Sequence, residues 1–79
     1  MRILHGNRDQ EALFAGLVQA ARGQLPDEGD YDCSIQGSGQ HFLVTLSDSA
    51  TREIVWEWAG TPEAVLKEFK RWVGRRKPN

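Results

Sequence analysis

Residues 53–77, EIVWEWAGTPEAVLKEFKRWVGRRK, contain a strand pattern followed by a helix pattern, and together they indicate the fold of this chain. In the first part of this stretch, Ile54, Trp56 and Trp58 fall on every second position, which is the spacing of a β-strand with one apolar face. After Gly60 the apolar residues recur at i, i+1, i+4, i+7 and i+8, which is the spacing of a helix. These helical positions are Val65, Leu66, Phe69, Trp72 and Val73. A strand and a helix with matching apolar faces and a short joint indicate a helix folded onto a sheet.

Capping residues mark where two helices begin. Thr61 is a good N-cap, and Pro62 occupies the first helical position, where no amide partner is lost. An earlier helix is predicted after Asn7, because Gln10 three residues on completes a capping box. Its predicted buried stripe consists of Leu13, Phe14, Leu17, Val18 and Ala21. Gly16 interrupts this helix, so we expect a close approach to the sheet at that point.

Two further strands are predicted between the helices, and short turns join the three strands. These turns are Gly37-Ser38-Gly39 and Asp48-Ser49-Ala50-Thr51. The order is helix, three-stranded antiparallel meander, helix, with a short extra strand within Met1–His5 left open. The predicted fold class is therefore an α+β two-layer sandwich. It forms a single domain over residues 1–79, of which 76–79 are expected to be a frayed basic tail.

Strand alternation assigns the two faces of the predicted sheet. The face toward the helices takes Tyr31, Cys33, Ile35, Phe42, Val44, Leu46, Ile54, Trp56 and Trp58. The opposite face takes Asp32, Ser34, Gln36, His41, Leu43, Thr45, Glu53, Val55 and Glu57. We expect this second face to be exposed to solvent, because no further element is predicted to cover it.

Length and composition limit the possible functions. A chain of 79 residues suffices for one small core. The single cysteine excludes an intramolecular disulfide and suits a reducing compartment. No apolar run is long enough for a signal peptide or a membrane span, so a cytoplasmic protein is expected.

Charge is unevenly distributed along the chain. Residues 1–60 carry four arginines against nine carboxylates, a net charge of −5, whereas residues 61–79 carry six cations against two carboxylates, a net charge of +4. A nucleic-acid-binding protein usually presents a basic surface over its docking face. Here only the last helix and the tail meet that description.

No catalytic, metal or cofactor site is predicted. The histidines, His5 and His41, and the only cysteine, Cys33, do not supply the ligand spacing of a zinc site. His41 begins the middle strand on the open face, where Asp32 or Glu53 is an expected neighbour. Cys33 is expected to be a buried, inert thiol. The three tryptophans are assigned to core packing rather than to stacking on bases.

Two charged surfaces are the candidate binding sites. The acidic surface is expected to meet a basic patch on a partner protein, with two apolar residues at its centre. It consists of Asp30, Asp32, Glu53, Glu57, Leu43 and Val55. The basic surface lies on the last helix, is the candidate nucleic-acid contact, and consists of Lys67, Lys70, Arg71 and Arg75. A homodimer that forms through the exposed sheet face or through an edge strand is a further alternative.

The order of elements over residues 7–76 resembles double-stranded-RNA-binding domains and the ribonucleases of HicA-type toxin–antitoxin pairs. The first resemblance implies lysine contacts from the start of the last helix, where this chain has Thr61-Pro62-Glu63-Ala64 and a first lysine at Lys67. The second implies a histidine directly after a Gly-Ser pair, where this chain has Gly39-Gln40 and only then His41. These resemblances imply a small RNA- or DNA-binding module, or a ribonuclease that uses His41.

In size, charge layout and lack of a catalytic motif, the chain resembles small phage-encoded anti-CRISPR proteins. This resemblance implies a non-enzymatic, cytoplasmic inhibitor that binds a Cascade-like CRISPR effector complex of the host. The inhibitor would occupy a basic nucleic-acid-binding surface of the complex and block target DNA binding. This is the leading hypothesis from the sequence, and the nucleic-acid-binding module is the alternative.

Overall fold

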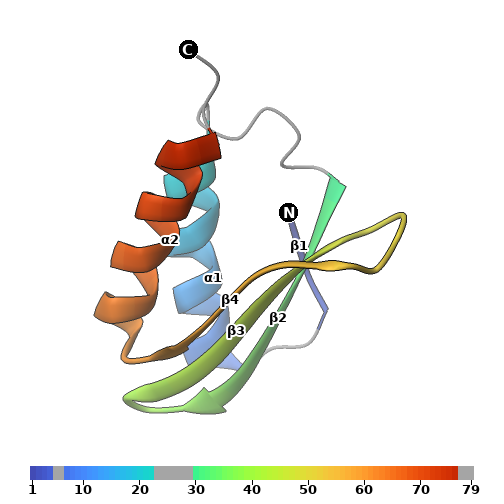
Figure 1. Cartoon of the computed structure of the whole chain (residues 1–79). Helices are drawn as coiled ribbons and strands as arrows, with labels where there is room; N and C mark the ends of the chain where they lie inside the picture. The colour runs from blue at the N-terminus through green and yellow to red at the C-terminus, as the bar shows by residue number, and fades with distance from the viewer. Residues whose placement is uncertain (5–6, 23–29, 77–79) are drawn as a thin grey trace.

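The predicted helix, three-stranded meander and second helix are present in the computed structural model, which describes residues 1–4, 7–22 and 30–76 (Figure 1). A short strand precedes these elements. The fold class is α+β, as predicted. The elements are β1 (Arg2–Ile3), α1 (Arg8–Ala21), β2 (Tyr31–Ser38), β3 (His41–Asp48), β4 (Ile54–Gly60) and α2 (Pro62–Arg76). Of the predicted frayed tail, Arg76 is the last residue of α2, and residues 77–79 lie outside the described residues.

The strands form one mixed sheet in the order β1-β2-β3-β4. The extra strand β1 runs parallel to β2 and pairs Arg2 with Asp32 and Ile3 with Cys33, whereas the other two pairings are antiparallel. The Leu4 N–H donates to the Cys33 carbonyl at 2.9 Å and extends this pairing by one bond. Both helices lie on the same side of the sheet (Figure 1). No element in the described part of the chain covers the opposite face.

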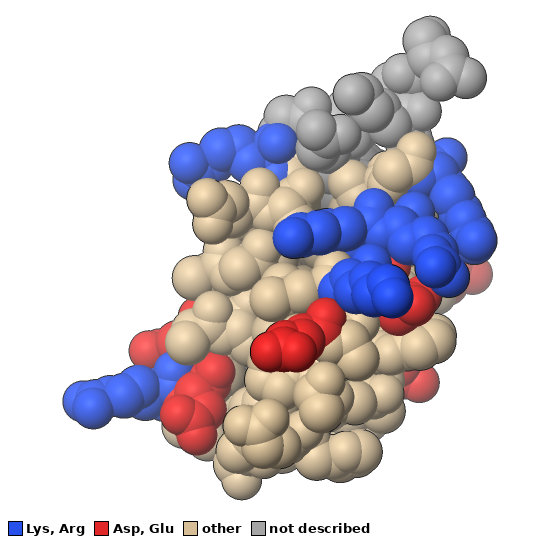
Figure 2. Space-filling model, turned by 90° about the vertical axis from the view of Figure 1, so that its left-hand side faces the viewer, with Lys and Arg blue, Asp and Glu red and all other residues tan. Residues whose placement is uncertain are grey.

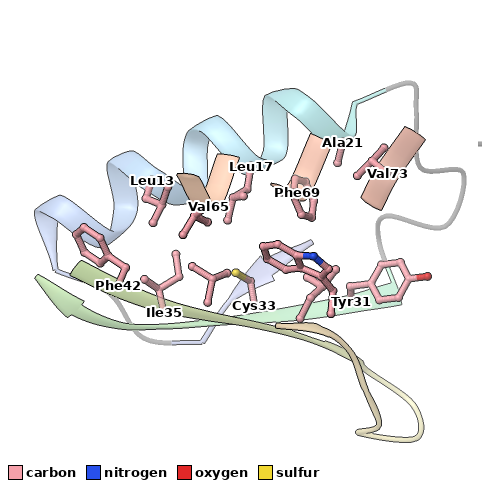
Figure 3. Close-up of a cluster of buried hydrophobic side chains, with 13 residues drawn as sticks. Leu13, Leu17, Ala21, Tyr31, Cys33, Ile35, Phe42, Val65, Phe69 and Val73 are labelled. Carbon is pink, nitrogen blue, oxygen red and sulfur yellow. The ribbon is translucent and has the colours of Figure 1, made fainter. Parts of the chain in front are cut away.

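The core lies between the helices and the sheet (Figure 3). Its buried side chains are Leu13, Leu17, Ala21, Tyr31, Cys33, Ile35, Phe42, Val44, Leu46, Trp56, Val65, Phe69 and Val73. The ring of Trp56 packs edge-on against Phe69 at 5.2 Å and lies 6.4 Å from Trp72. Such ring pairs contribute about 0.5–1.5 kcal/mol beyond the burial of apolar area, which helps a chain of this size to hold one core.

The capping residues begin both helices as predicted. The Asn7 side chain accepts from the Gln10 N–H, and the Gln10 side chain accepts from the Asn7 N–H, each at 3.0 Å. The Thr61 hydroxyl accepts from the Ala64 N–H at 3.2 Å, so Pro62 is the first residue of α2. Within the described residues, neither α1 nor α2 is long and apolar enough to cross a membrane.

Gly16 permits a close approach, but its neighbour is the second helix and not the sheet. A Cβ at this position would lie 3.1 Å from Leu66 Cδ2 of α2. The prediction of a helix–sheet contact is therefore wrong, because α1 lies beside α2 as well as above β2, and a glycine lets the two helices pack closely.

The first hairpin turns later than predicted. Gly37 and Ser38 still belong to β2, and the turn is formed by Gly39 and Gln40, so that Ser38 pairs with His41. Gly39 has φ +67°, as the first central residue of a type II′ turn requires. Gly37 has φ +98°, and a Cβ there would collide with the His41 carbonyl oxygen. The glycine that suggested the turn is thus needed inside the strand.

A β-bulge changes the faces at the start of β4. Leu46 pairs with Trp56, but the next residue, Ser47, pairs with Ile54, so Val55 is an extra residue in β4. Ser47 belongs to the uncovered face, and Ile54 therefore lies on that face with 59% of its surface exposed. Val55 is half-buried and packs against the core. The predicted faces of Ile54 and Val55 are both wrong, because simple alternation cannot register the extra residue.

Candidate protein-binding surfaces

The uncovered face of the sheet carries an apolar pair beside a polar pair. Leu43 of β3 lies opposite Ala59 of β4, and Thr45 lies opposite Glu57. The Thr45 hydroxyl donates to Glu57 Oε2 at 2.9 Å and holds that carboxylate on this face. Glu57 and Ala59 are exposed, and Leu43 is half-buried. Of the predicted acidic surface, the structure brings Leu43 and Glu57 together.

Asp32 lies on the same face, but its charge is engaged. Arg2 Nη2 lies 3.2 Å from Asp32 Oδ1, and the Ser49 hydroxyl donates to the same oxygen at 3.0 Å. Only 17% of the Asp32 side chain is exposed, against 74% of the Arg2 side chain. A partner that approaches this face therefore meets the two residues as a pair, and the arginine is the more accessible of them.

Asp30 and Glu53 lie at one end of the sheet, beside the turn between β3 and β4. The Asp30 carbonyl accepts from the Ser49 N–H at 2.7 Å, and the Glu53 carbonyl accepts from the Asp48 N–H at 2.9 Å. Both residues are exposed. Asp48 lies five positions after Leu43, which is about 17 Å along β3. These carboxylates form an acidic end of the sheet and do not surround Leu43 as predicted.

The turn at this acidic end is held by Asp48. Its Oδ1 accepts from the Ala50 N–H at 2.8 Å and from the Thr51 N–H at 3.0 Å. These backbone hydrogen bonds, with that from Thr51 the stronger influence, favour the charged carboxylate and hold the pKa of Asp48 below its usual range. Arg52 follows with φ +64° and completes the reversal of the chain.

The residues considered for catalysis are dispersed. His41 lies at the hairpin end of β3, whereas Asp32 and Glu53 lie at the other end, so the prediction that they are neighbours is wrong. Cys33 is buried as predicted, and the loss of solvation raises the pKa of its thiol to about 12. Among the described residues, which do not include His5, no three His, Cys, Asp or Glu side chains gather as a metal site would require.

The basic surface on α2 forms as a continuous group. Figure 2 shows lysine and arginine side chains gathered over one part of the face that α2 presents. Its members are all exposed, and they are Lys67, Lys70, Arg71 and Arg75. Arg71 Nη1 lies 3.7 Å from Glu68 Oε1, a long and partly exposed pair that solvent screens. The structure thus brings together all four residues that the sequence assigned to this surface.

A groove between β4 and α2 was not predicted. It has a volume of about 230 Å³ and is lined by Trp56, Glu57, Trp58, Glu68, Arg71, Trp72 and Arg75. Trp58 faces the helices as predicted, since it pairs with Val44, yet 41% of its surface is exposed. The position of β4 at the end of the meander was the available signal, because an edge strand has no neighbour to cover its outer side.

Comparison of the chain with models of protein families, with curated proteins and with solved structures finds no match.

Proposed function

We propose that this protein is a non-enzymatic protein-binding inhibitor of anti-CRISPR type. It acts in the host cytoplasm by occupying a basic, nucleic-acid-binding surface of a Cascade-like CRISPR effector complex and so blocks target DNA binding. The observation that carries the proposal is the sheet face that no described element covers. Its residues are not needed to fill the core, and it presents an apolar pair beside an exposed carboxylate.

The chemistry of this face favours a basic protein surface. Leu43 and Ala59 supply an apolar centre, which loses contact with water on binding, while Glu57 is exposed and already oriented by Thr45. The acidic end adds Glu53 and its neighbours within the reach of a partner that extends along the sheet. Charges arranged in this way steer association and set specificity more than they set affinity.

The first test is an affinity pull-down of the tagged protein from a lysate that contains a type I CRISPR effector complex, with nuclease treatment. Stoichiometric recovery of effector subunits that survives the nuclease supports the proposal. Recovery of nucleic acid alone, lost on nuclease treatment, contradicts it.

A pair of variants tests the choice of surface. Joint charge reversal by Glu53→Lys and Glu57→Lys is expected to abolish effector binding while the thermal unfolding transition is kept. The matched control, Glu11→Lys with Glu63→Lys, makes the same change in net charge on the helical side, where both residues are exposed. Equal binding by both double variants would show that this face is not the interface.

The gathered cations of α2 favour a second candidate function, which is direct binding of RNA or DNA. It predicts an affinity that falls steeply with salt, because each phosphate contact releases a counterion. Replacing Lys67, Lys70 and Arg71 by alanine should remove most of that salt dependence. The control variant loses the same charge outside the basic surface, by replacement of Arg8, Arg22 and Arg52. If the variant that lacks Lys67, Lys70 and Arg71 still bound nucleic acid, this candidate function would be eliminated.

A further inference from the structure

The outer edge of β4 has backbone groups that no described strand pairs with. The Asp48 N–H donates toward β4, to Glu53, and backbone direction alternates along a strand, so Val44 and Leu46 also direct their backbone groups to β4. Their partners, Trp58 and Trp56, therefore face back toward β3. It follows that the N–H and C=O groups of the residues between and beyond them, Glu57 and Ala59, are directed outward.

The groove between β4 and α2 runs along this same edge. Trp56 and Trp58 line it from the helix-facing side of the strand, and Glu57 lines it although its side chain belongs to the other face. Side chains from both faces of β4 can line one groove only at the unpaired edge of the strand. The groove therefore opens at the outer edge of β4. A chain that paired with Glu57 and Ala59 would place alternate side chains directly into it.

The walls of the groove combine three tryptophans with charged residues of both signs, two arginines and two glutamates. Trp56 lies level with Trp72, since their rings are 6.4 Å apart. On this side of the groove α2 adds Arg71 and Arg75 and one carboxylate, Glu68, so its contribution is cationic on balance. Arg75 makes no salt bridge with another described residue, and Arg71 has only the long contact to Glu68. The groove therefore suits an apolar side chain opposite Trp58 and a carboxylate two residues away, opposite Trp56.

We propose that the edge of β4 binds an extended segment of a partner protein as an added antiparallel strand. Because the added strand runs opposite to β4, its residues meet Trp58, Glu57 and Trp56 in that order from N- to C-terminus. The favoured segment is an apolar or aromatic residue, then a lysine or arginine opposite Glu57, then an aspartate or glutamate beside Arg71 and Arg75. Cross-strand pairs of opposite charge are favourable, and this mode of recognition uses main-chain bonds for affinity and pockets for specificity.

A second copy of this chain fits the edge less well. Antiparallel self-pairing that places Trp56 of each copy opposite Trp58 of the other also places Glu57 directly opposite Glu57, and like charges in that position are destabilising. Shifting the register so that Trp58 pairs with itself places Gly60 of the second copy opposite Trp56, so no carboxylate lies beside Arg71 and Arg75. The charges of the edge thus favour a partner with the order apolar, basic, acidic.

The test uses blocked peptides and the full chain. The peptide Thr-Phe-Lys-Asp-Thr is expected to shift the amide resonances of Glu57 and Ala59 and the indole resonance of Trp58. The peptide Thr-Phe-Asp-Lys-Thr, of the same composition, is expected to bind about tenfold more weakly, because it places like charges at both positions. Equal affinities, or shifts confined to other residues, would overturn the proposal.

Methylation of single peptide nitrogens tests the added strand without changing the protein. The lysine N–H of the peptide lies opposite Glu57 and is directed at it, so N-methylation there should abolish binding. N-methylation of the phenylalanine, whose N–H is directed away from β4, should leave binding within about twofold. Equal effects of the two methyl groups, or concentration-dependent dimerisation through β4 that excludes the peptide, would contradict the proposal. The proposal of an added strand does not rest on the function proposed for the uncovered face. The peptide-binding test and the effector pull-down can therefore fail separately.

Discussion

The two faces of the sheet are built from the same strands, yet adjacent residues on them have different roles. On the covered face Phe42, Val44 and Leu46 are in contact with the helices and are almost fully buried. On the uncovered face Leu43 and Thr45, which alternate with them, remain partly accessible. Stability therefore rests mainly on the covered face, whereas residues of the uncovered face can be replaced to suit a binding partner without loss of the core. Paired substitutions on the two faces test this difference in their contributions to stability.

The largest contrast is expected between Phe42 and Leu43, which are neighbours on β3. Phe42→Ala leaves a cavity beneath the helices and should lower the free energy of unfolding by about 3–5 kcal/mol. Leu43→Ala removes a half-exposed side chain and should lower it by less than about 1 kcal/mol. Urea unfolding of both variants measures the difference. Similar losses would show that the uncovered face is covered in solution, for example by a second copy.

The next contrast is between two glycines of the first hairpin. Gly37→Ala forces a Cβ against the His41 carbonyl at positive φ and should lower the free energy of unfolding by about 2–3 kcal/mol. Gly39→Ala also meets positive φ, but its Cβ would have no neighbour within 4 Å, so about 1 kcal/mol is expected. Thermal unfolding of the two variants decides between them, and the opposite order would place the strained position in the turn.

Much of the fold could be predicted because the signals are local. Asn7, Gln10 and Thr61 cap helices through their own neighbours in the chain, and the apolar periods of α1, α2, β2 and β3 are regular. The bulge at Val55 could not be predicted in this way. The bulge depends on the register in which β4 pairs with β3 after the turn. Either register places an apolar residue toward the core, Ile54 with simple alternation or Val55 with the bulge, so the sequence does not distinguish them.

Because of the bulge, truncation of Val55 is expected to destabilise the fold more than truncation of the larger Ile54. Val55 packs against the core, so Val55→Ala should lower the free energy of unfolding by about 1–1.5 kcal/mol. Ile54 is a larger residue but lies on the uncovered face, and Ile54→Ala should change that free energy by no more than about 0.5 kcal/mol. If Ile54 proved the more costly position, simple alternation would hold and the bulge would be wrong.

The candidate surfaces could be predicted only in part. Lys67, Lys70, Arg71 and Arg75 gather as expected because one helix carries them all, and helical spacing is known from the sequence. The acidic residues come from different strands and turns, so their grouping depends on register. Asp32 in addition acquires Arg2 through the parallel pairing of β1, which no local pattern indicates.

The last expected effect is a pH dependence of stability that reports on the covered face alone. Cys33 is buried there, and the loss of solvation raises its thiol pKa from 9.0 to about 12. The folded state therefore keeps the thiol proton at pH values where the unfolded chain releases it. The contribution of the thiol to stability is complete below pH 9 and is lost as the pH rises toward 12, by about 1 kcal/mol at pH 10.

Cys33→Ala isolates this contribution from the other groups that titrate at high pH. The difference in free energy of unfolding between the natural chain and the variant should be constant from pH 7 to pH 8 and should narrow by about 1 kcal/mol at pH 10. A thiol on the uncovered face would keep its ordinary pKa in the folded state, and the difference would then not change with pH. A pH-independent difference would therefore mean that water reaches the covered face, and the distinction between the two faces would lose its physical basis.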